Sequence, residues 1–210
     1  GGKIICNYKT ANSAAACVNN VGTFVMNGGE LDAAMVAVWA DSATTIKDGN
    51  VTAPYGVWVN KGIANIEGGT FVAAPTAVYT YTASAKAYIS GGTFSVSGDD
   101  NRYLLNKLDS ARDSVIVVSG GTYYGFDPAN NTAEGASTNM LAENACSSMA
   151  EDGVFAVQEC NHVATIGDTH YDTLSEAIAA VQSGETITLL ADCSGNGIKV
   201  AGGKNFTVDF

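Results

Sequence analysis

Asp99 and Asp100 are the side chains of this sequence that come nearest to a catalytic pair. Glycoside hydrolysis requires two carboxyl groups about 5–10 Å apart, one as acid and one as base or nucleophile. Asp48 and Glu67 would add carboxylates from other segments, and Arg102 would supply the basic group of a calcium-assisted lyase. The two aspartates follow SVSG, however, which is typical of a solvated turn. We therefore predict no catalytic residues, with a polysaccharide lyase or hydrolase as the alternative.

The five cysteines and two histidines do not form a recognisable metal motif. The cysteines include no CxxC pair, and no histidine stands at metal-ligand spacing from them. His162 and His170 have no nucleophile nearby in the sequence, so we expect surface or packing roles for both. An odd number of cysteines leaves at least one thiol unpaired, while Cys146 and Cys160 are close enough in sequence to bridge locally. The alternative for these two is that they are small buried apolar residues. We predict neither a metal nor a cofactor.

Four aromatic residues recur at nearly constant spacing. Trp39, Trp58, Tyr79 and Tyr103 follow one another at steps of 19, 21 and 24 residues, each in a strand-like segment. If these segments stack, the rings form a ladder with a spacing of about 5 Å. A row of exposed rings can bind the faces of sugars, which makes these four residues our candidate glycan-binding set. The alternative is a ladder that only packs and stabilises the fold.

A repeated sequence motif, here called the phrase, indicates the strands that must position this ladder. It is a strand-like run followed by glycine. The phrase reads FVMNGGEL at 24–31, TIKDGNVT at 45–52, ANIEGGTF at 64–71, AYISGGTF at 87–94 and IVVSGGTY at 116–123. Its first glycines are separated by 21, 19, 23 and 29 residues. A period near 20 is typical of one rung, meaning one turn, of a parallel β-solenoid. We predict a right-handed parallel β-helix over residues 1–123.

The residues around each phrase predict which side chains face inward. Val38, Val57 and Val78 each precede a ladder aromatic and therefore point to the opposite face of their strand. We favour valines inside and aromatics outside, and the inverse is the alternative. Glycine pairs permit the corners of a rung, and the threonines that follow them at 70, 93 and 122 are expected to form a column.

Two further segments follow the rungs. Residues 124–163 lose the period and predict an irregular cap and linker, with a short helix at 139–145 and a strand at 153–158. Residues 164–210 then predict a plug helix and the first rungs of a β-helix. Thr173 and Glu176 form a capping box at the start of that helix, and Gly184 is expected to stop it. The strands expected next are 185–192 and 205–210.

Composition excludes some partners. The formal net charge is −11, and Arg102 and Arg112 are the only arginines, so nothing would neutralise the phosphates of nucleic acid or the anionic surface of a membrane. No apolar run approaches the ~18 residues of a transmembrane helix. The low proportion of charged residues, 15%, together with abundant glycine, favours an extracellular, cell-surface or virion protein. The start at Gly1 suggests a piece of something longer.

The combination of YDTLSEAIAAVQSGETITLLAD, the GGTF rungs and YYGFDPANN resembles pectate-lyase-like right-handed β-helix modules of gut bacterial surface proteins and phage fibres. In that pattern the plug helix comes first, whereas here it comes last. Reading from the end of the chain back to its start gives KNFTVDF followed by GGKIICNYK, with Cys193 and Cys6 one rung apart. Residues 164–210 would then begin the next module or stack on a neighbouring subunit, and a plain boundary within a longer protein is the alternative. The predicted seam consists of Cys6, Cys193, Phe206, Val208 and Phe210.

The function expected from the sequence is therefore a structural or adhesive module of an extracellular fibre, surface protein or phage appendage. Its expected partners are copies of itself, stacked head to tail. A glycan-binding adhesin that uses the aromatic ladder is the first alternative, and a carbohydrate-active enzyme, as the resemblance allows, is the second.

Overall fold

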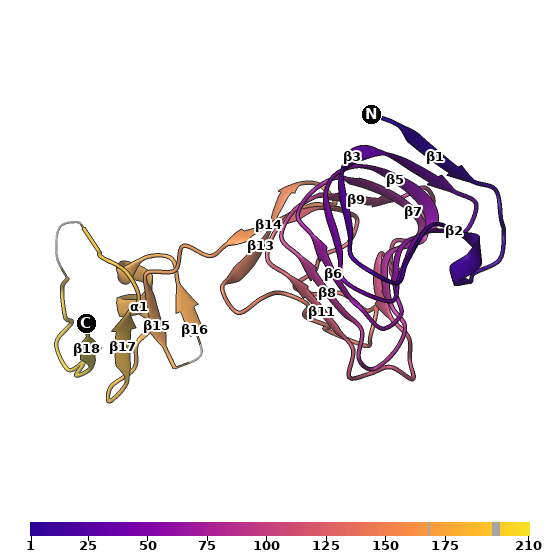
Figure 1. The fold of residues 1–210 in the computed structure, drawn as a ribbon. Coiled ribbons are helices and arrows are strands. Elements are labelled where there is room, and N and C mark those ends of the chain that lie inside the picture. Colours follow the sequence, from indigo (N-terminus) through magenta and orange to yellow (C-terminus); the bar gives the residue numbers. More distant parts are fainter. Residues whose placement is uncertain (168, 195–197) are drawn as a thin grey trace. The chain divides into compact units, whose positions relative to one another are not determined.

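The computed structural model describes residues 1–167, 169–194 and 198–210, and the chain divides into two compact units, residues 1–159 and 160–210 (Figure 1). The first unit is a parallel β-solenoid, which confirms the predicted all-β fold class. The second unit holds the only α-helix among the described residues.

The first unit consists almost entirely of strands. After β1 (Lys3–Cys6) and a short 3₁₀ helix (Ser13–Ala15), the chain forms β2 (Ala16–Asn20), β3 (Phe24–Ala33), β4 (Val36–Ala40), β5 (Thr44–Val59), β6 (Ile63–Ile66), β7 (Thr70–Thr80), β8 (Lys86–Ile89), β9 (Thr93–Val96), β10 (Leu105–Lys107), β11 (Val115–Val118) and β12 (Gly121–Tyr124). Strands β3, β5 and β7 are long because each bends through at least one corner of the solenoid without interruption.

These strands stack in register to form three faces around one interior (Figure 1). The first face joins the start of β3, the start of β5, β6, β8 and β11. The second face follows the glycines and joins β1, the end of β3, the middle of β5, the start of β7, β9 and β12. The third face joins β2, β4, the end of β5, the end of β7 and β10.

The interior is lined by the small and branched side chains that the sequence predicted. Val38, Val57 and Val78 are fully buried in the main core, so the prediction of valines inside is confirmed. An aromatic stack also lies inside, which the sequence reasoning did not anticipate. Phe71 and Phe94 stack with ring centroids 4.8 Å apart, and Phe94 and Tyr123 with centroids 5.0 Å apart. All three rings follow a GGT phrase directly, so the repeat itself carried this signal.

Glycine is required at the corner between the first and second faces. A Cβ on Gly91 would lie 2.3 Å from the carbonyl oxygen of Glu67 in the rung below, and Gly92 has a φ of +107°. Strand register then pairs Thr70 with Thr93 and Thr93 with Thr122, which confirms the predicted threonine column. The glycine pairs therefore allow close stacking of backbones where any side chain would intrude.

The last rung is covered by a β-hairpin rather than by irregular chain alone. Strands β13 (Ala145–Glu151) and β14 (Val154–Glu159) are antiparallel, and β14 also pairs antiparallel with β12. The predicted strand at 153–158 is thus confirmed. The helix predicted at 139–145 is wrong: Asn131 and Thr138 bridge just before it, and Leu141 bridges to Val118, so backbone pairing with the solenoid replaces a helical turn.

The second unit is a small sheet covered by a helix. Strands β15 (Ala164–Ile166), β16 (Thr169–Tyr171) and β17 (Thr186–Leu189) are antiparallel neighbours in the order β16-β15-β17, and β18 (Thr207–Asp209) pairs parallel with β17. Helix α1 (Leu174–Ala180) begins with the predicted capping box of Thr173 and Glu176. It ends at Ala180, before the predicted stop at Gly184, and buries Ala177 against Ala164 and Ile187.

The cysteines differ in state. Cys146 and Cys160 are disulfide-bonded, in agreement with the bridge expected between them, whereas Cys6, Cys17 and Cys193 are free thiols. No helix in the described part of the chain is long and apolar enough to cross a membrane.

Candidate functional site

The aromatic ladder exists on the outside of the third face for three of its four predicted members. Trp39 is paired in register with Trp58, and Trp58 with Tyr79. The indoles of Trp39 and Trp58 stack with centroids 5.1 Å apart, and the ring of Tyr79 meets Trp58 edge-on at 4.7 Å. These rings form a cluster separate from the main core, as expected for side chains on the opposite face from the valines.

Tyr103 is not the fourth rung of this ladder, and that part of the prediction is wrong. Strand β10 begins at Leu105, which pairs with Val78, so Asn106 occupies the position above Tyr79. Leu105 replaces the inward valine of the preceding rungs and is fully buried. In the earlier rungs an inward aliphatic residue is followed by an outward residue, and this pattern aligns Asn106 with Tyr79. Aligning the aromatic residues with one another instead placed Tyr103 there, three residues too early.

The two indoles are largely covered, so they do not present flat faces to solvent. Trp39 is 9% exposed and Trp58 is 7% exposed. Tyr55 and Tyr81 pack against Trp58 with ring centroids 4.9 and 5.0 Å away. The faces that a sugar would stack on are therefore occupied by neighbouring rings, which gives the tryptophans a packing role.

Polar partners distinguish the two indoles. Trp39 Nε1 donates to Asp41 Oδ2 over 3.2 Å, and the other oxygen of Asp41 accepts from Asn60 Nδ2 over 2.6 Å. Trp58 Nε1 is buried and has no partner. A buried N–H without a partner costs stability, so packing, and not a hydrogen bond, holds the second indole in place.

A hollow lies beside Tyr79 and Tyr55 of this cluster. It has a volume of about 290 Å³, and we call it the tyrosine hollow; its lining consists of Tyr55, Pro75, Thr76, Tyr79, Tyr103, Asn106 and Asp109. Tyr103 thus reaches the same site as Tyr79 without being its rung partner. Three aromatic rings with an amide and a carboxylate suit a sugar, whose C–H face packs on rings while its hydroxyls accept and donate hydrogen bonds.

The surroundings of Tyr79 raise the pKa of its phenol. Burial raises the pKa of Tyr79 to about 12, and the neighbouring tyrosines 55 and 81 and the carboxylates of Asp109 and Glu134 add to the shift. The phenol is protonated at neutral pH, as an ordinary tyrosine is, and can donate a hydrogen bond; the raised pKa extends this state to more alkaline pH. The guanidinium of Arg102 lies 5.6 Å from the ring centroid of Tyr103, which supports the second ring by a cation–π contact.

The carboxylates considered for catalysis do not line this hollow. Asp99 and Asp100 are exposed on the turn after β9, where Asp100 Oδ1 accepts a hydrogen bond from the backbone of Arg102 over 3.1 Å. Asp48 caps the backbone of Gly49 over 2.7 Å. Asp48 and Asp100 therefore have local turn roles. Sequence reasoning missed Asp109, because a single aspartate after LNKL carries no motif.

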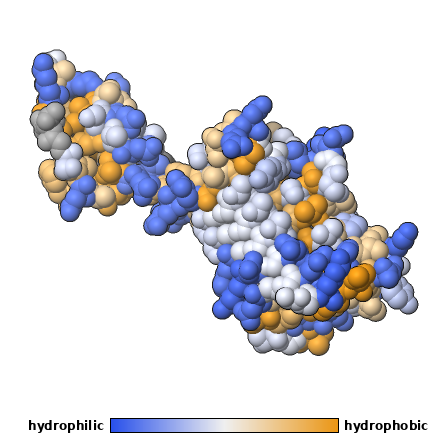
Figure 2. All heavy atoms as spheres, turned by 90° about the horizontal axis from the view of Figure 1, so that it is seen from above, coloured by the Kyte–Doolittle hydropathy of each residue, from blue (hydrophilic) through white to orange (hydrophobic). Residues whose placement is uncertain are grey.

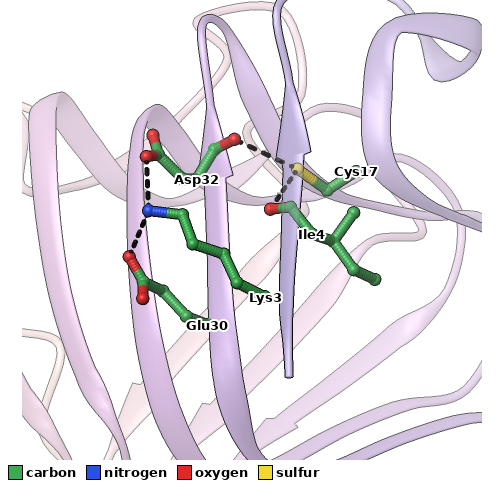
Figure 3. A network of polar contacts seen from close by, with 5 residues as sticks. All are labelled: Lys3, Ile4, Cys17, Glu30 and Asp32. Carbon is green, nitrogen blue, oxygen red and sulfur yellow. Dashed lines mark hydrogen bonds and ion pairs between the residues drawn. The ribbon is translucent and has the colours of Figure 1, made fainter. Parts of the chain in front are cut away.

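Several strands lie at a sheet edge, among them β1 in the first unit and β18 in the second, which pairs only with β17. Strand β1 pairs only with β3, and its Ile4 and Ile5 are 49% and 59% exposed. Figure 3 shows Lys3 of this strand between two carboxylates, with Nζ 2.6 Å from Glu30 Oε1 and 2.9 Å from Asp32 Oδ2. These contacts raise the pKa of Lys3 and hold β1 to β3.

Of the predicted seam residues, Cys6 and Val208 lie in these two strands, Phe206 and Phe210 flank β18, and Cys193 lies outside the strands. Cys6 ends β1 and its Sγ donates to Ala15 O over 2.9 Å. On the second unit, Val208 lies in β18, Phe206 packs partly on the small core, and Phe210 is 96% exposed. Cys193 is exposed beside a hollow of about 480 Å³ lined by Leu174, Leu189–Cys193 and Phe210. Hydrophobic side chains reach the surface of each unit (Figure 2).

The two histidines lie together in the second unit. Their ring centroids are 4.9 Å apart, and His162 Nδ1 is 2.7 Å from Asp172 Oδ1. His170 is exposed and His162 is half-buried, so both have the surface and packing roles expected from the sequence.

No protein-family model, no curated protein and no solved structure matches this chain. The fold and the geometry of these surfaces are therefore the observations on which a function can be argued.

Proposed function

We propose that this chain is a non-enzymatic structural and adhesive β-solenoid segment of an extracellular fibre, surface protein or phage appendage, and that it binds glycans in the tyrosine hollow. The observation that carries the proposal is the meeting of Tyr55, Tyr79 and Tyr103 around one hollow. Its volume of about 290 Å³ suits a single sugar ring. An oxidising location fits the disulfide-bonded state of Cys146 and Cys160.

Binding fits this hollow better than catalysis. Its lining contains one carboxylate, Asp109, whereas glycoside hydrolysis uses two. The side chain of Asn106 adds a neutral hydrogen-bonding group, which orients a ligand without transferring protons at neutral pH, whereas Thr76 is buried. The solenoid then acts as a rigid scaffold that holds the tyrosines in place before the ligand arrives, which lowers the entropy cost of binding.

The test is a glycan array followed by titration calorimetry on the strongest binders. Tyr79→Ala and Tyr103→Ala should each weaken binding by about five- to thirtyfold, since losing a ring that stacks on a ligand costs about 1–2 kcal/mol. Tyr88→Ala, on the half-exposed tyrosine of β8, is the matched control and should leave binding unchanged. Failure to bind any glycan, or equal loss in the control, would refute the proposal.

A second candidate function, head-to-tail assembly, is favoured by the edge strands β1 and β18. Strand β1 of one copy and β18 of another both offer a free parallel edge flanked by exposed apolar residues, Ile5 on the first and Phe210 on the second. Unpaired edges of this kind are templates for pairing with another chain. Because the two edges differ, the contact is heterologous, and such a contact generates a fibre wherever its rotation does not close a ring.

Analytical ultracentrifugation over a range of concentrations tests this assembly. The wild-type chain should form a concentration-dependent series of oligomers, and Ile5→Lys or Phe210→Lys should shift it to monomer. Met149→Lys, at a 62% exposed position of the cap hairpin, is the control for added charge. A wild-type chain that remains monomeric at the highest concentration reached would contradict the candidate.

A further inference from the structure

A second hollow adjoins the tyrosine hollow and carries charge. It has a volume of about 490 Å³, and we call it the ionic hollow; its lining consists of Lys107, Asp109, Arg112, Ala133, Glu134 and Gly135. Asp109 lines both hollows, and Asn106 of the first is followed in β10 by Lys107 of the second. A ligand longer than one sugar ring in the tyrosine hollow would therefore extend into the ionic hollow.

The two cations of the ionic hollow form no close ion pair among the described residues, although Asp109 and Glu134 give the same lining two negative charges. Among the described residues, ion pairs within 4.0 Å involve only Lys3 and His162 as the positive groups, so Lys107 and Arg112 have no carboxylate at that distance. Arg112 is exposed and Lys107 is half-buried. In a chain with a net charge of −11, two unpaired cations lining one hollow are available to an anion from outside.

Within the described part of the chain, the two carboxylates of the ionic hollow, Glu134 and Asp109, form no ion pair with its cations. Glu134 Oε1 accepts a hydrogen bond from the backbone N–H of Lys107 over 2.7 Å, which holds the carboxylate against β10. Asp109 is exposed between the two hollows and can accept hydrogen bonds from sugar hydroxyls. Each cation thus remains free to bind an acidic group while the carboxylates orient the neutral part of the ligand.

We propose that the two hollows form one binding site for an anionic oligosaccharide, with a neutral ring in the tyrosine hollow and a carboxylate or sulfate on the next unit bound by Lys107 and Arg112. Arg112 contributes a planar group that can bind a carboxylate or sulfate through two N–H bonds, and Lys107 adds a point charge. This inference rests on the proposed glycan-binding function and names its ligand class.

The experiment compares matched ligands that differ in charge. Hyaluronan oligosaccharides alternate a uronate with a neutral N-acetylated sugar, and chitin oligosaccharides of the same length are neutral. Calorimetry at about 20 mM salt should give at least tenfold tighter binding of the anionic ligand, and the preference should shrink at about 300 mM salt because exposed charges are screened. Sulfated glycosaminoglycan fragments extend the comparison to sulfate.

The variants separate this inference from the function it rests on. The double variant Lys107→Gln, Arg112→Gln should reduce anionic binding to the neutral level. Lys47→Gln with Lys86→Gln removes the same charge at exposed positions outside both hollows and should leave the preference intact. Circular dichroism and thermal melting check that each variant is folded.

Each outcome decides one claim. If neutral and anionic ligands bind equally and both lose affinity in Tyr79→Ala, glycan binding stands and the anionic preference is refuted. If the preference persists in the Lys107→Gln, Arg112→Gln double variant, the ionic hollow is not its source and the inference fails. If no oligosaccharide binds, both the inference and the proposed function fall.

Discussion

The indole of Trp39 lies on the indole of Trp58 with the ring planes inclined by 13°, yet only Trp39 has a hydrogen-bond partner. The two side chains occupy equivalent positions of adjacent rungs and are buried to nearly the same extent. They differ in whether the indole N–H is satisfied and in their ring contacts, since Trp58 also packs against Tyr55 and Tyr79.

Replacing each indole by phenylalanine should separate the two environments. Trp39→Phe removes the donor to Asp41 and leaves a carboxylate oxygen without that partner, while Trp58→Phe removes an N–H that has none. We expect Trp39→Phe to cost about 1–2 kcal/mol more free energy of unfolding than Trp58→Phe. Urea denaturation of both variants measures the difference. Equal losses would contradict the prediction and would mean that the Asp41 contact does not outweigh the additional ring contacts of Trp58.

Alanine at a corner glycine should disrupt the stacking of rungs. At Gly91 a Cβ would lie 2.3 Å from the carbonyl oxygen of Glu67, so the backbone of one rung must move. We expect Gly91→Ala to destabilise the solenoid by at least about 2 kcal/mol. Gly98→Ala is the control, since a Cβ at that position would have no heavy atom of another segment within 4 Å. A melting temperature for Gly91→Ala equal to that of the control would contradict the close contact.

The internal aromatic stack should be a main source of stability. Phe94 is fully buried between Phe71 below and Tyr123 above. Phe94→Ala leaves a cavity between two rings and should cost about 3–5 kcal/mol. Phe94→Leu fills most of that volume and should recover part of the loss. Denaturant titration of the two variants tests the order, and a smaller cost for alanine than for leucine would exclude the stacked arrangement.

Alkaline pH should destabilise the first unit through two tyrosines. The pKa of Tyr79 is raised to about 12 and that of buried Tyr123 is raised as well, from a reference value of 10.0. Because the folded state holds these protons more tightly than the unfolded state, the contribution to stability is complete below about pH 10 and is lost as the pH rises through about 12.

Absorbance of tyrosinate while the protein is still folded measures this shift. Of the nine tyrosines, Tyr79 and Tyr123 should ionise last. Tyr79→Phe should flatten the loss of melting temperature between about pH 10 and about pH 12, since one of the two shifted groups is gone. Simultaneous ionisation of all nine tyrosines near pH 10 in the folded protein would refute the burial of both rings.

The repeat in the sequence was sufficient to predict the solenoid because its physical requirements recur at every turn. Backbones at Gly68 and Gly91 approach the carbonyl oxygens of the preceding rung to distances that exclude a Cβ, so glycine must return with the period of the fold. Neighbouring side chains of a strand point to opposite faces, so the sequence also predicted Val57 inside and Trp58 outside.

The site was less predictable because it depends on register and on side chains distant in sequence. Spacing alone paired Tyr103 with Tyr79, but the loop before β10 takes up three more residues and brings Asn106 to that position. Tyr103 nevertheless reaches the hollow from the loop, where no periodic pattern applies. The sequence did not predict how little of each tryptophan is exposed, because that depends on which rings, such as Tyr55 and Tyr81, pack against the indoles in the fold.

The sequence by itself determined the architecture: the inward valines, the glycine corners, the threonine column and the capped helix all follow from local rules that each segment obeys independently. Only the tertiary structure decided which residues meet around the tyrosine hollow and the ionic hollow. The physical reason is that each rung obeys the same backbone constraints, whereas the loops between rungs are free to differ in length. Those differences set where Tyr103, Asp109 and Glu134 arrive, and so they set what the surface can bind.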